Sequence, residues 1–342
     1  MTTAETPEPK GYAVTPTIIK RLKKILFVVH RYAPFPGGSE NYVKDMAEET
    51  LSRGHTVAVF AGEHMGDYHG VRVSSDSKIL TESWDLIVVH GGDVGIQNFV
   101  LKHADKLGGP VLYLLILPSN SVECVSALHR ASYLGCSTIA DWRHVDAYKA
   151  QSRAVRVRHG INLEESVGMP GFRKAHGIKT RFMFLSSGGY WPNKAFGELV
   201  EVFKSNHRVD ATLVLTGYDN RHGLMPPDEE FVRSFMLEDR AEMLSALMDA
   251  DLYILNSTSE GFGLVLLESM INMTPWAGRN IAGAELMRDY GFTYNTKEEL
   301  GMFLHSFMGI GAASEHLLQA QRYVIATHLI KHTVDDLLRV GQ

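Results

Sequence analysis

Short, continuous apolar runs recur along the first half of the chain. They cover residues 25–29, 56–61, 86–89 and 111–117. Runs of this length without polar alternation are typical of strands buried on both faces, as in parallel sheets. Between the first two runs, residues 41–53 place apolar side chains at helical intervals and end at Gly54, a common helix stop. The first half therefore predicts one wound α/β domain.

The same pattern restarts in the second half. Apolar runs at residues 182–186, 212–216 and 252–255 predict strands, and residues 196–204 and 241–249 predict helices between them. This predicts a second parallel sheet, with the domain boundary near residue 158. Open sheets of this kind bind ligands beyond the carboxyl ends of their strands, so we expect the site in a cleft between the two domains.

Composition supports two globular domains and limits the possible functions. The 342 residues are 45% hydrophobic and 21% charged, and no apolar run approaches the roughly 20 residues of a membrane-spanning helix. The polar, acidic start predicts a loose tail over residues 1–18 rather than a secretory signal. The two cysteines, Cys124 and Cys136, are too few for a disulfide framework. We therefore expect a cytoplasmic protein.

The charge is unevenly distributed between the halves. Residues 1–158 carry 18 Lys and Arg against 16 Asp and Glu, whereas the remainder carries 16 against 23. The net charge of −5 argues against a dedicated nucleic-acid partner, because phosphate contacts require clustered cations. The slightly basic first half is the part suited to an anionic partner.

The most informative motif follows the predicted strand 252–255. Glu260 precedes a Gly-aromatic-Gly turn, and Glu268 comes eight positions later in a predicted helix. The glycines allow backbone amides at a helix start to approach phosphate or hydroxyl oxygens closely. An ordinary glycine turn with a solvated glutamate has the same pattern, so the residues alone leave both interpretations open.

This motif resembles the signature of the retaining glycosyltransferases of family 4, within the glycosyl transferases group 1. The resemblance implies the GT-B fold, in which two Rossmann-like, doubly wound parallel-sheet domains face a central cleft. It also implies that Glu260 holds the donor sugar and Glu268 binds the nucleotide ribose. The turn and the following helix start then bind donor sugar and phosphate through Gly261, Phe262, Gly263, Leu264 and Val265.

Further segments are similar to the same family. Gly37 and Gly38, after the first strand, resemble its glycine pair near the donor phosphates or the acceptor, and Lys194 resembles its diphosphate-binding lysine. The implied domains are an acceptor-side domain over residues 19–158 and a nucleotide-sugar domain over residues 159–328. Residues 329–342 are then a final helix that crosses back to the first domain. Residues 158–162, 274–275 and 283–285 also resemble family segments.

Two positions depart from the family pattern. Gly189 stands where an arginine is usual, so half of the diphosphate clamp is missing or comes from elsewhere, with Arg31 and Arg279 as candidates. Leu117 stands where many members have a histidine. We consider His90, at the end of the strand 86–89, as its catalytic replacement, although a histidine at a strand end is more often structural.

Other patterns carry less weight. Asp249 and Asp251 match a metal-binding Asp-x-Asp, but they span a predicted helix end and strand start and are expected to be structural. The cysteines and histidines have no zinc spacing, and no Walker-type loop occurs. We therefore expect no metal and no cofactor.

The combined prediction is a metal-independent retaining glycosyltransferase, a hexosyl- or pentosyltransferase that uses a nucleotide-diphosphate sugar. Small-molecule, lipid-linked and polysaccharide acceptors all stay open, as does peripheral contact with the inner face of a membrane. One alternative is a catalytically idle nucleotide-sugar-binding module, suggested by Gly189 and Leu117. A further alternative, glycosylation of modified DNA bases, is disfavoured by the net charge.

Overall fold

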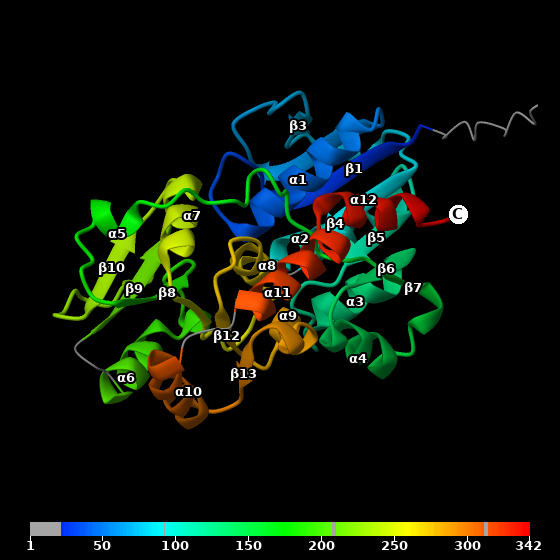
Figure 1. The fold of residues 1–342 in the computed structure, drawn as a ribbon. Coiled ribbons are helices and arrows are strands. Elements are labelled where there is room, and N and C mark those ends of the chain that lie inside the picture. Colours follow the sequence, from blue (N-terminus) through cyan, green and yellow to red (C-terminus); the bar gives the residue numbers. More distant parts are fainter. Residues whose placement is uncertain (1–21, 92, 207–209, 311–313) are drawn as a thin grey trace, which may run out of the picture.

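The fold consists of two α/β domains, each built on a parallel sheet (Figure 1). The computed structural model describes residues 22–91, 93–206, 210–310 and 314–342. The predicted tail over residues 1–18 lies outside the described residues. The fold class predicted from the sequence is confirmed, with seven strands in the first sheet and six in the second.

The first sheet has the order β3-β2-β1-β4-β5-β6-β7, and its neighbouring strands pair in parallel. Its strands are β1 (Lys24–Arg31), β2 (Thr56–Glu63), β3 (Arg72–Ser74), β4 (Leu86–His90), β5 (Val111–Leu114), β6 (Tyr133–Cys136) and β7 (Ala154–Arg156). The helices α1 (Gly38–Ser52), α2 (Val94–His103), α3 (Val122–Arg130) and α4 (Ile139–Ala147) connect them. Because β1 lies near the middle of the sheet, its carboxyl end opens onto the centre of the molecule.

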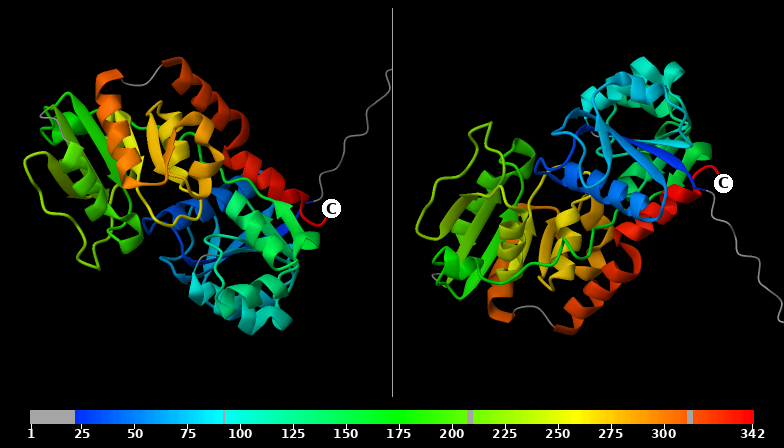
Figure 2. Two further views of the ribbon diagram at one scale, coloured as in Figure 1. Left: turned by 90° about the horizontal axis from the view of Figure 1, so that it is seen from below. Right: turned by 90° about the horizontal axis from the view of Figure 1, so that it is seen from above.

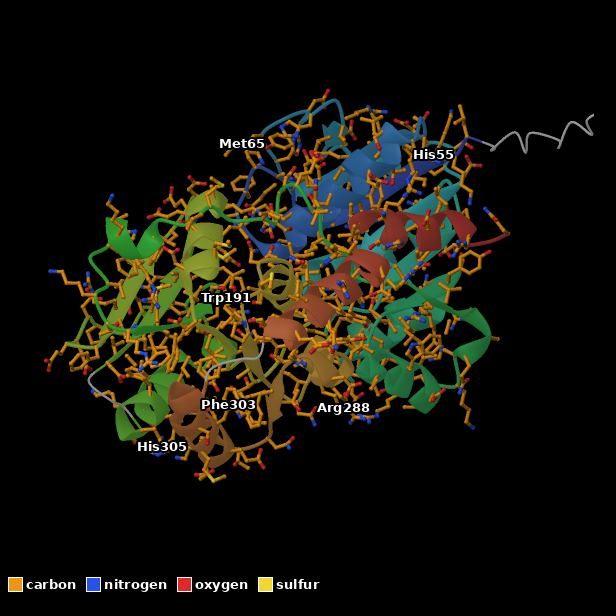
Figure 3. All side chains as sticks on the ribbon, viewed as in Figure 1. His55, Met65, Trp191, Arg288, Phe303 and His305 are labelled. Carbon is orange, nitrogen blue, oxygen red and sulfur yellow. The ribbon has the colours of Figure 1, made fainter. Side chains whose placement is uncertain are left out.

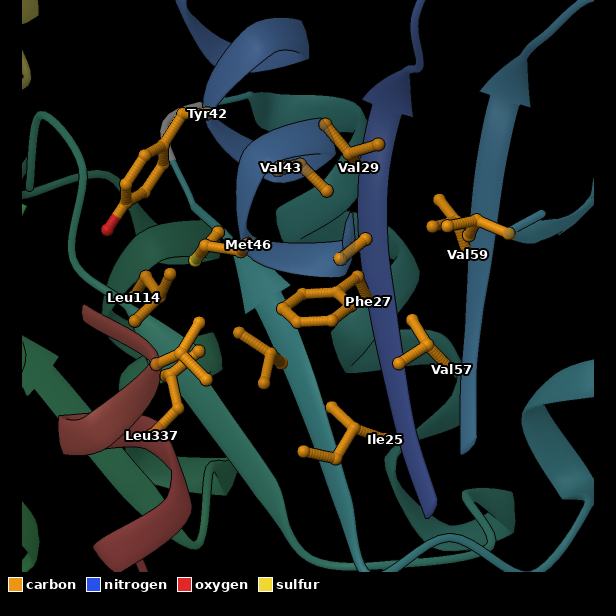
Figure 4. Packing of buried hydrophobic residues seen from close by; sticks show 14 of the residues in the cluster. Ile25, Phe27, Val29, Tyr42, Val43, Met46, Val57, Val59, Leu114 and Leu337 are labelled. Carbon is orange, nitrogen blue, oxygen red and sulfur yellow. The ribbon is translucent and has the colours of Figure 1, made fainter. Parts of the chain in front are cut away.

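Helices cover both faces of this sheet, so residues 25–29 of β1 are buried. Ile25, Phe27 and Val29 pack on one face against α1 and the last helix, α12 (Ile330–Arg339) (Figure 4). Leu26 and Val28 belong to the hydrophobic core on the other face. Two-sided burial explains why β1 is apolar without alternation.

The second sheet has the order β10-β9-β8-β11-β12-β13. Its strands are β8 (Phe182–Ser187), β9 (Ala211–Gly217), β10 (Val232–Met236), β11 (Leu252–Leu255), β12 (Trp276–Arg279) and β13 (Phe292–Tyr294). Its helices are α5 (Phe172–Ala175), α6 (Phe196–Asn206), α7 (Arg240–Asp249), α8 (Leu264–Ile271), α9 (Ala282–Leu286), α10 (Lys297–Ile310) and α11 (Ser314–Thr327).

The strands follow the sequence prediction to different degrees. The apolar run 252–255 is β11 without change, whereas the run 111–117 forms a strand only to Leu114. Leu117 has a φ of 52°, which no strand accommodates. The unpredicted strands β3 and β13 have three residues each, too few for a recognisable period.

The chain crosses between the domains at two adjacent places. Ile161 pairs in parallel with Leu329, and the Ile330 amide donates to the Ile161 carbonyl at 2.8 Å. From this crossing α12 runs back along the first domain, where it is the red helix in Figure 2. Gly160 is required here, because a Cβ on it would lie 2.5 Å from the carbonyl oxygen of Leu329.

Replacing Gly160 with alanine should therefore lower the free energy of unfolding by about 2 kcal/mol or more, as overpacking does elsewhere. Urea denaturation measures this change. Gly197→Ala is the matched control, because a Cβ there has no atom within 4 Å and the site lies in α6. It should be neutral or stabilising by up to about 1 kcal/mol. Equal stability of both variants would contradict the packing argument at the crossing.

Candidate functional site

A cleft of about 870 Å³ lies between the two domains, at the carboxyl ends of both sheets. Loops after β1, β4 and β5 line one wall, and loops after β8, β9, β10 and β11 line the other. All eleven predicted site residues line this single cleft: Gly37, Gly38, His90, Lys194, Glu260, Gly261, Phe262, Gly263, Leu264, Val265 and Glu268. The structure thus brings the predicted residues together, but their roles stay predictions.

The two glycines of the turn after β11 are required for different structural reasons. Gly263 has a φ of 86°, a left-handed conformation that side chains rarely adopt, and it begins α8. A Cβ on Gly261 would lie 2.5 Å from Cγ2 of Ile116, which belongs to the first domain. The turn therefore lies directly against the opposite wall, and the first amides of α8 border the cleft.

The side chain of Phe262 takes part in a domain contact. It is 3% exposed and stacks on His159 with ring centroids 4.7 Å apart. His159 stacks in turn on Tyr42 of α1, also at 4.7 Å. This column of three rings joins the glycine turn to the first domain, so only the backbone of Phe262 is suited to contact a ligand. No sequence signal singled out Tyr42.

Lys194 and Glu260 form an ion pair on the second-domain wall. The Lys194 Nζ donates to the Glu260 Oε1 at 2.5 Å, and Ser257 Oγ donates to the same oxygen at 2.6 Å. Gly188 makes room for the lysine, since a Cβ on it would lie 2.8 Å from Lys194 Cε. The two charges predicted to contact a donor therefore neutralise one another in this ion pair.

Glu268 lies little more than one turn into α8, because this helix begins at Leu264. The Glu268 side chain is 6% exposed, and the Arg240 Nη2 donates to its Oε1 at 2.6 Å. Arg240 also donates to the Glu165 carbonyl, and the Glu165 carboxylate pairs with Lys44 of α1. Sequence reasoning missed Arg240, Lys44 and Glu165, because their link to Glu268 exists only in three dimensions.

Gly37 and Gly38 lie beside the carboxylate of Glu40 on the first-domain wall. A Cβ on Gly37 would lie 2.2 Å from Glu40 Oε2, so the turn leaves space for this side chain. Glu40 is 3% exposed and accepts from Arg31 Nε at 2.8 Å. Burial by itself would raise the pKa of Glu40, but hydrogen bonds from His30 and Arg31 outweigh it and lower that pKa. Glu40 is therefore ionised and held by cations.

The two candidates for the missing arginine lie in different places. Arg279 donates to the Asn256 carbonyl at 2.9 Å and pairs with Glu198, outside the residues that line the cleft. Arg31 lines the cleft. At Gly189 a Cβ would lie 2.5 Å from Trp191 Cε2, so the indole covers this position. Trp191, labelled in Figure 3, belongs to the second domain and lines the cleft.

His90 borders the cleft from the first domain. It is 5% exposed, and its ring meets Tyr42 edge-on with centroids 6.2 Å apart. Burial, with a smaller contribution from the charge of His30, lowers the pKa of His90 to about 4. The imidazole is therefore neutral at pH 7. This geometry fits a packed histidine as well as one that contacts a sugar.

A neutral buried histidine makes stability depend on pH. Between the unfolded pKa of about 6.5 and the folded value of about 4, the unfolded chain binds more protons, so stability falls as pH falls. We expect the wild type to lose about 2 kcal/mol more than His90→Gln between pH 7 and pH 5. Urea denaturation at both pH values tests this. Asp45, whose pKa burial raises to about 6, acts oppositely but is common to both proteins.

The exposed His316 gives a control, because His316→Gln should leave the pH dependence of the wild type unchanged. Parallel curves for His90→Gln and the wild type would contradict a neutral buried imidazole.

Asp249 and Asp251 have structural roles, as expected. Asp249 Oδ2 accepts from the amides of Gly171 and Arg173, and Asp251 pairs with the Arg173 guanidinium. Among the described residues, no group of three or more His, Cys, Asp or Glu side chains is placed to hold a metal ion. Within the same part of the chain, no helix is long and apolar enough to cross a membrane.

Comparisons with known proteins agree with this geometry. Residues 180–302 match the protein-family model described as Glycosyl transferases group 1, and this segment contains both Lys194 and the Glu260 to Glu268 motif. No curated protein matches the chain in sequence. The second domain thus contains a segment that is similar to group 1 glycosyltransferases.

Solved structures share the whole fold at low sequence identity. HepE from Anabaena in complex with UDP-glucose has a TM-score of 0.75 at 18% identity, over 92% of this chain and 99% of that one. Sucrose-phosphate synthase from Thermosynechococcus elongatus has a TM-score of 0.75 at 14% identity, and the match covers 92% of this chain and 97% of that one. WaaG, a glycosyltransferase involved in lipopolysaccharide biosynthesis, has a TM-score of 0.65 at 19% identity, and the match covers 93% of this chain and 100% of that one. The chain therefore has the GT-B fold.

Proposed function

We propose that this chain is a metal-independent retaining glycosyltransferase that moves a sugar from a nucleotide-diphosphate sugar to an acceptor hydroxyl. The observation that carries the proposal is the composition of one cleft wall. Within the segment matched by the group 1 family, it combines the Lys194–Glu260 pair, the amides that begin α8, and the carboxylate of Glu268.

Each group suits one part of such a donor. A buried carboxylate such as Glu268 accepts hydrogen bonds from both ribose hydroxyls, and the amides at a helix start suit phosphate oxygens. The Lys194 ammonium suits the diphosphate, and Glu260 suits the sugar hydroxyls. The HepE structures with UDP and with UDP-glucose support a uridine donor as the first one to test.

The reaction then depends on positioning and charge stabilisation. The bond from the sugar anomeric carbon to the diphosphate oxygen breaks, and the acceptor oxygen bonds to the same face of the sugar. The acceptor proton passes to the departing diphosphate. Lys194 and the α8 amides stabilise the charge that grows on this leaving group, which is where electrostatic catalysis is strongest. The acceptor occupies the first-domain wall.

The first experiment incubates the protein with UDP-, GDP- and ADP-sugars and follows donor hydrolysis and saturable nucleotide binding. We expect binding of at least one nucleotide and slow hydrolysis of its sugar. Absence of binding to every nucleotide would refute the proposal. Binding without transfer to any acceptor would instead favour an idle binding module, an alternative supported by the indole that covers Gly189 and by Leu117 in the cleft.

Glu268→Ala should weaken nucleotide binding by about 10- to 150-fold, because it removes charge-assisted hydrogen bonds to the ribose. The loss should be equal for the nucleoside mono- and diphosphate, which share the ribose, and isothermal titration measures both. Glu201→Ala, at an exposed position of α6, is the control and should bind normally. Unchanged affinity in Glu268→Ala would remove this residue from the nucleotide site.

A further inference from the structure

The second-domain wall has little net positive charge to offer a diphosphate. A diphosphate group carries at least two negative charges. The cations of this wall, Lys194, Arg221 and Arg240, are each paired with a carboxylate, and the Lys194 ammonium is 2.5 Å from Glu260. The two side chains are only 15% and 14% exposed, so water screens this pair weakly. A diphosphate held by Lys194 therefore needs a second cation.

Arg31 provides a cation on the opposite wall. It ends β1, its side chain is 19% exposed, and it lines the cleft. Its Nε and Nη2 both go to Oε1 of Glu40, at 2.8 and 2.7 Å, and Nη2 also donates to the Pro36 carbonyl at 3.2 Å. A guanidinium presents five donors in a planar fork, so Arg31 can bind phosphate oxygens while it keeps a contact with Glu40.

Tyr218 lines the same cleft as both ion pairs. It follows β9, lines the cleft, and meets Trp191 edge-on with ring centroids 5.8 Å apart. Burial raises the pKa of Tyr218, and the charges of Glu40, Arg31 and Glu260 all act on it as well. The Arg31–Glu40 pair of one domain and the Lys194–Glu260 pair of the other therefore line one cleft together with this tyrosine.

Other arginines are placed less well. Arg279 lies outside the cleft lining, where Glu198 and the Asn256 carbonyl hold it. Arg221 lines the cleft, but its side chain is 63% exposed and pairs with Asp219, two residues away. Arg240 is engaged by Glu268 on the wall proposed for the ribose. These contacts leave Arg31 as the best-placed partner for Lys194.

We propose that Arg31 is the second cation of the diphosphate site, so that the diphosphate is held between Lys194 of one domain and Arg31 of the other. This inference rests on the proposed function. It assigns a donor contact to the first domain, and it couples diphosphate binding to the approach of the two walls. A nucleoside monophosphate, which has one phosphate fewer, should gain little from Arg31.

The test compares the dissociation constants of UDP and UMP, or of the guanosine or adenosine pair if the wild type prefers it. Arg31→Ala should weaken diphosphate binding by about 10- to 150-fold and monophosphate binding by less than about threefold. Arg31→Lys should retain part of the preference, because it keeps the charge. Arg279→Ala and Arg221→Ala, the matched controls, should keep the wild-type ratio of the two constants.

A second variant controls for misfolding, because Arg31→Ala leaves the buried Glu40 carboxylate with fewer hydrogen-bond partners and could disturb the fold around it. The double variant Arg31→Ala/Glu40→Gln removes both charges and should show the same loss of diphosphate preference. Glu40→Gln alone should bind the diphosphate at least as tightly as the wild type, because Arg31 no longer has a competing carboxylate. A purely structural role for Arg31 predicts neither result.

Several outcomes would overturn the inference. The inference fails if Arg31→Ala keeps the wild-type ratio of the diphosphate and monophosphate dissociation constants, or weakens binding of both nucleotides equally. It also fails if Arg221→Ala or Arg279→Ala changes that ratio. If Lys194→Ala loses diphosphate preference while Arg31→Ala keeps it, this inference alone fails. If the wild type binds no nucleotide at all, the proposed function fails with it.

Discussion

Lys194→Ala should lower the rate of sugar transfer by about 10²- to 10³-fold, the usual cost of removing one group that stabilises charge in a transition state. Negative charge grows on the diphosphate as the donor bond breaks, so the ammonium stabilises the transition state more than the bound donor. Affinity for the nucleoside diphosphate should fall as well, but by a smaller factor, and the monophosphate should bind almost normally.

Steady-state kinetics with a donor identified by hydrolysis, together with isothermal titration of both nucleotides, separates these effects. Lys204→Ala is the matched control, because this lysine of α6 is 52% exposed and pairs with Glu229 away from the cleft lining. It should leave rate and affinity unchanged. Equal weakening of both nucleotides by Lys194→Ala, with a normal rate, would contradict its assignment to the leaving group.

Glu260→Ala should abolish sugar transfer and leave nucleotide affinity nearly intact. The carboxylate is proposed to hold the sugar, so its loss leaves the reacting carbon badly positioned, and misplaced groups cost large factors in rate. The variant also releases Lys194 from its ion pair. Affinity for the free nucleoside diphosphate should therefore stay the same or rise, which is opposite in direction to the effect of Lys194→Ala.

The measurement is transfer to any active acceptor, with donor hydrolysis as the second readout. Glu242→Gln is the control, because Glu242 is 40% exposed, pairs with His176, and lies outside the cleft lining. Normal transfer by Glu260→Ala would refute its assignment to the sugar. Loss of nucleotide binding in the same variant would indicate that Glu260 supports the fold of the wall instead.

The chain pattern was sufficient to predict both sheets and the loops that form the cleft. Strands buried on two faces must be apolar throughout, so β1, β4, β8 and β11 were visible in the sequence. Parallel strands place their carboxyl ends at one edge, so glycines and charged residues directly after such strands were expected to meet. The eleven predicted residues do line one cleft.

The electrostatic partners could not be predicted in this way. Lys194 and Glu260 are 66 positions apart, and the Arg240–Glu268 pair spans 28 positions between two helices. The local periodicity of the sequence does not predict such pairs, because they depend on how distant loops and helices pack against one another. The same holds for Arg31 and Arg279, which the sequence left as equal candidates and which lie in different surroundings.

By itself, therefore, the sequence determined the two α/β domains, the glycine turns and the wall that carries Glu260 and Glu268, because local periodicity and backbone conformation are properties of neighbouring residues. Only the tertiary structure decided that Phe262 stacks on His159, and that Lys194 pairs with Glu260 on one wall and Arg31 with Glu40 on the other. Burial and ion pairing depend on surroundings that distant segments create, and those surroundings exist only in the folded chain.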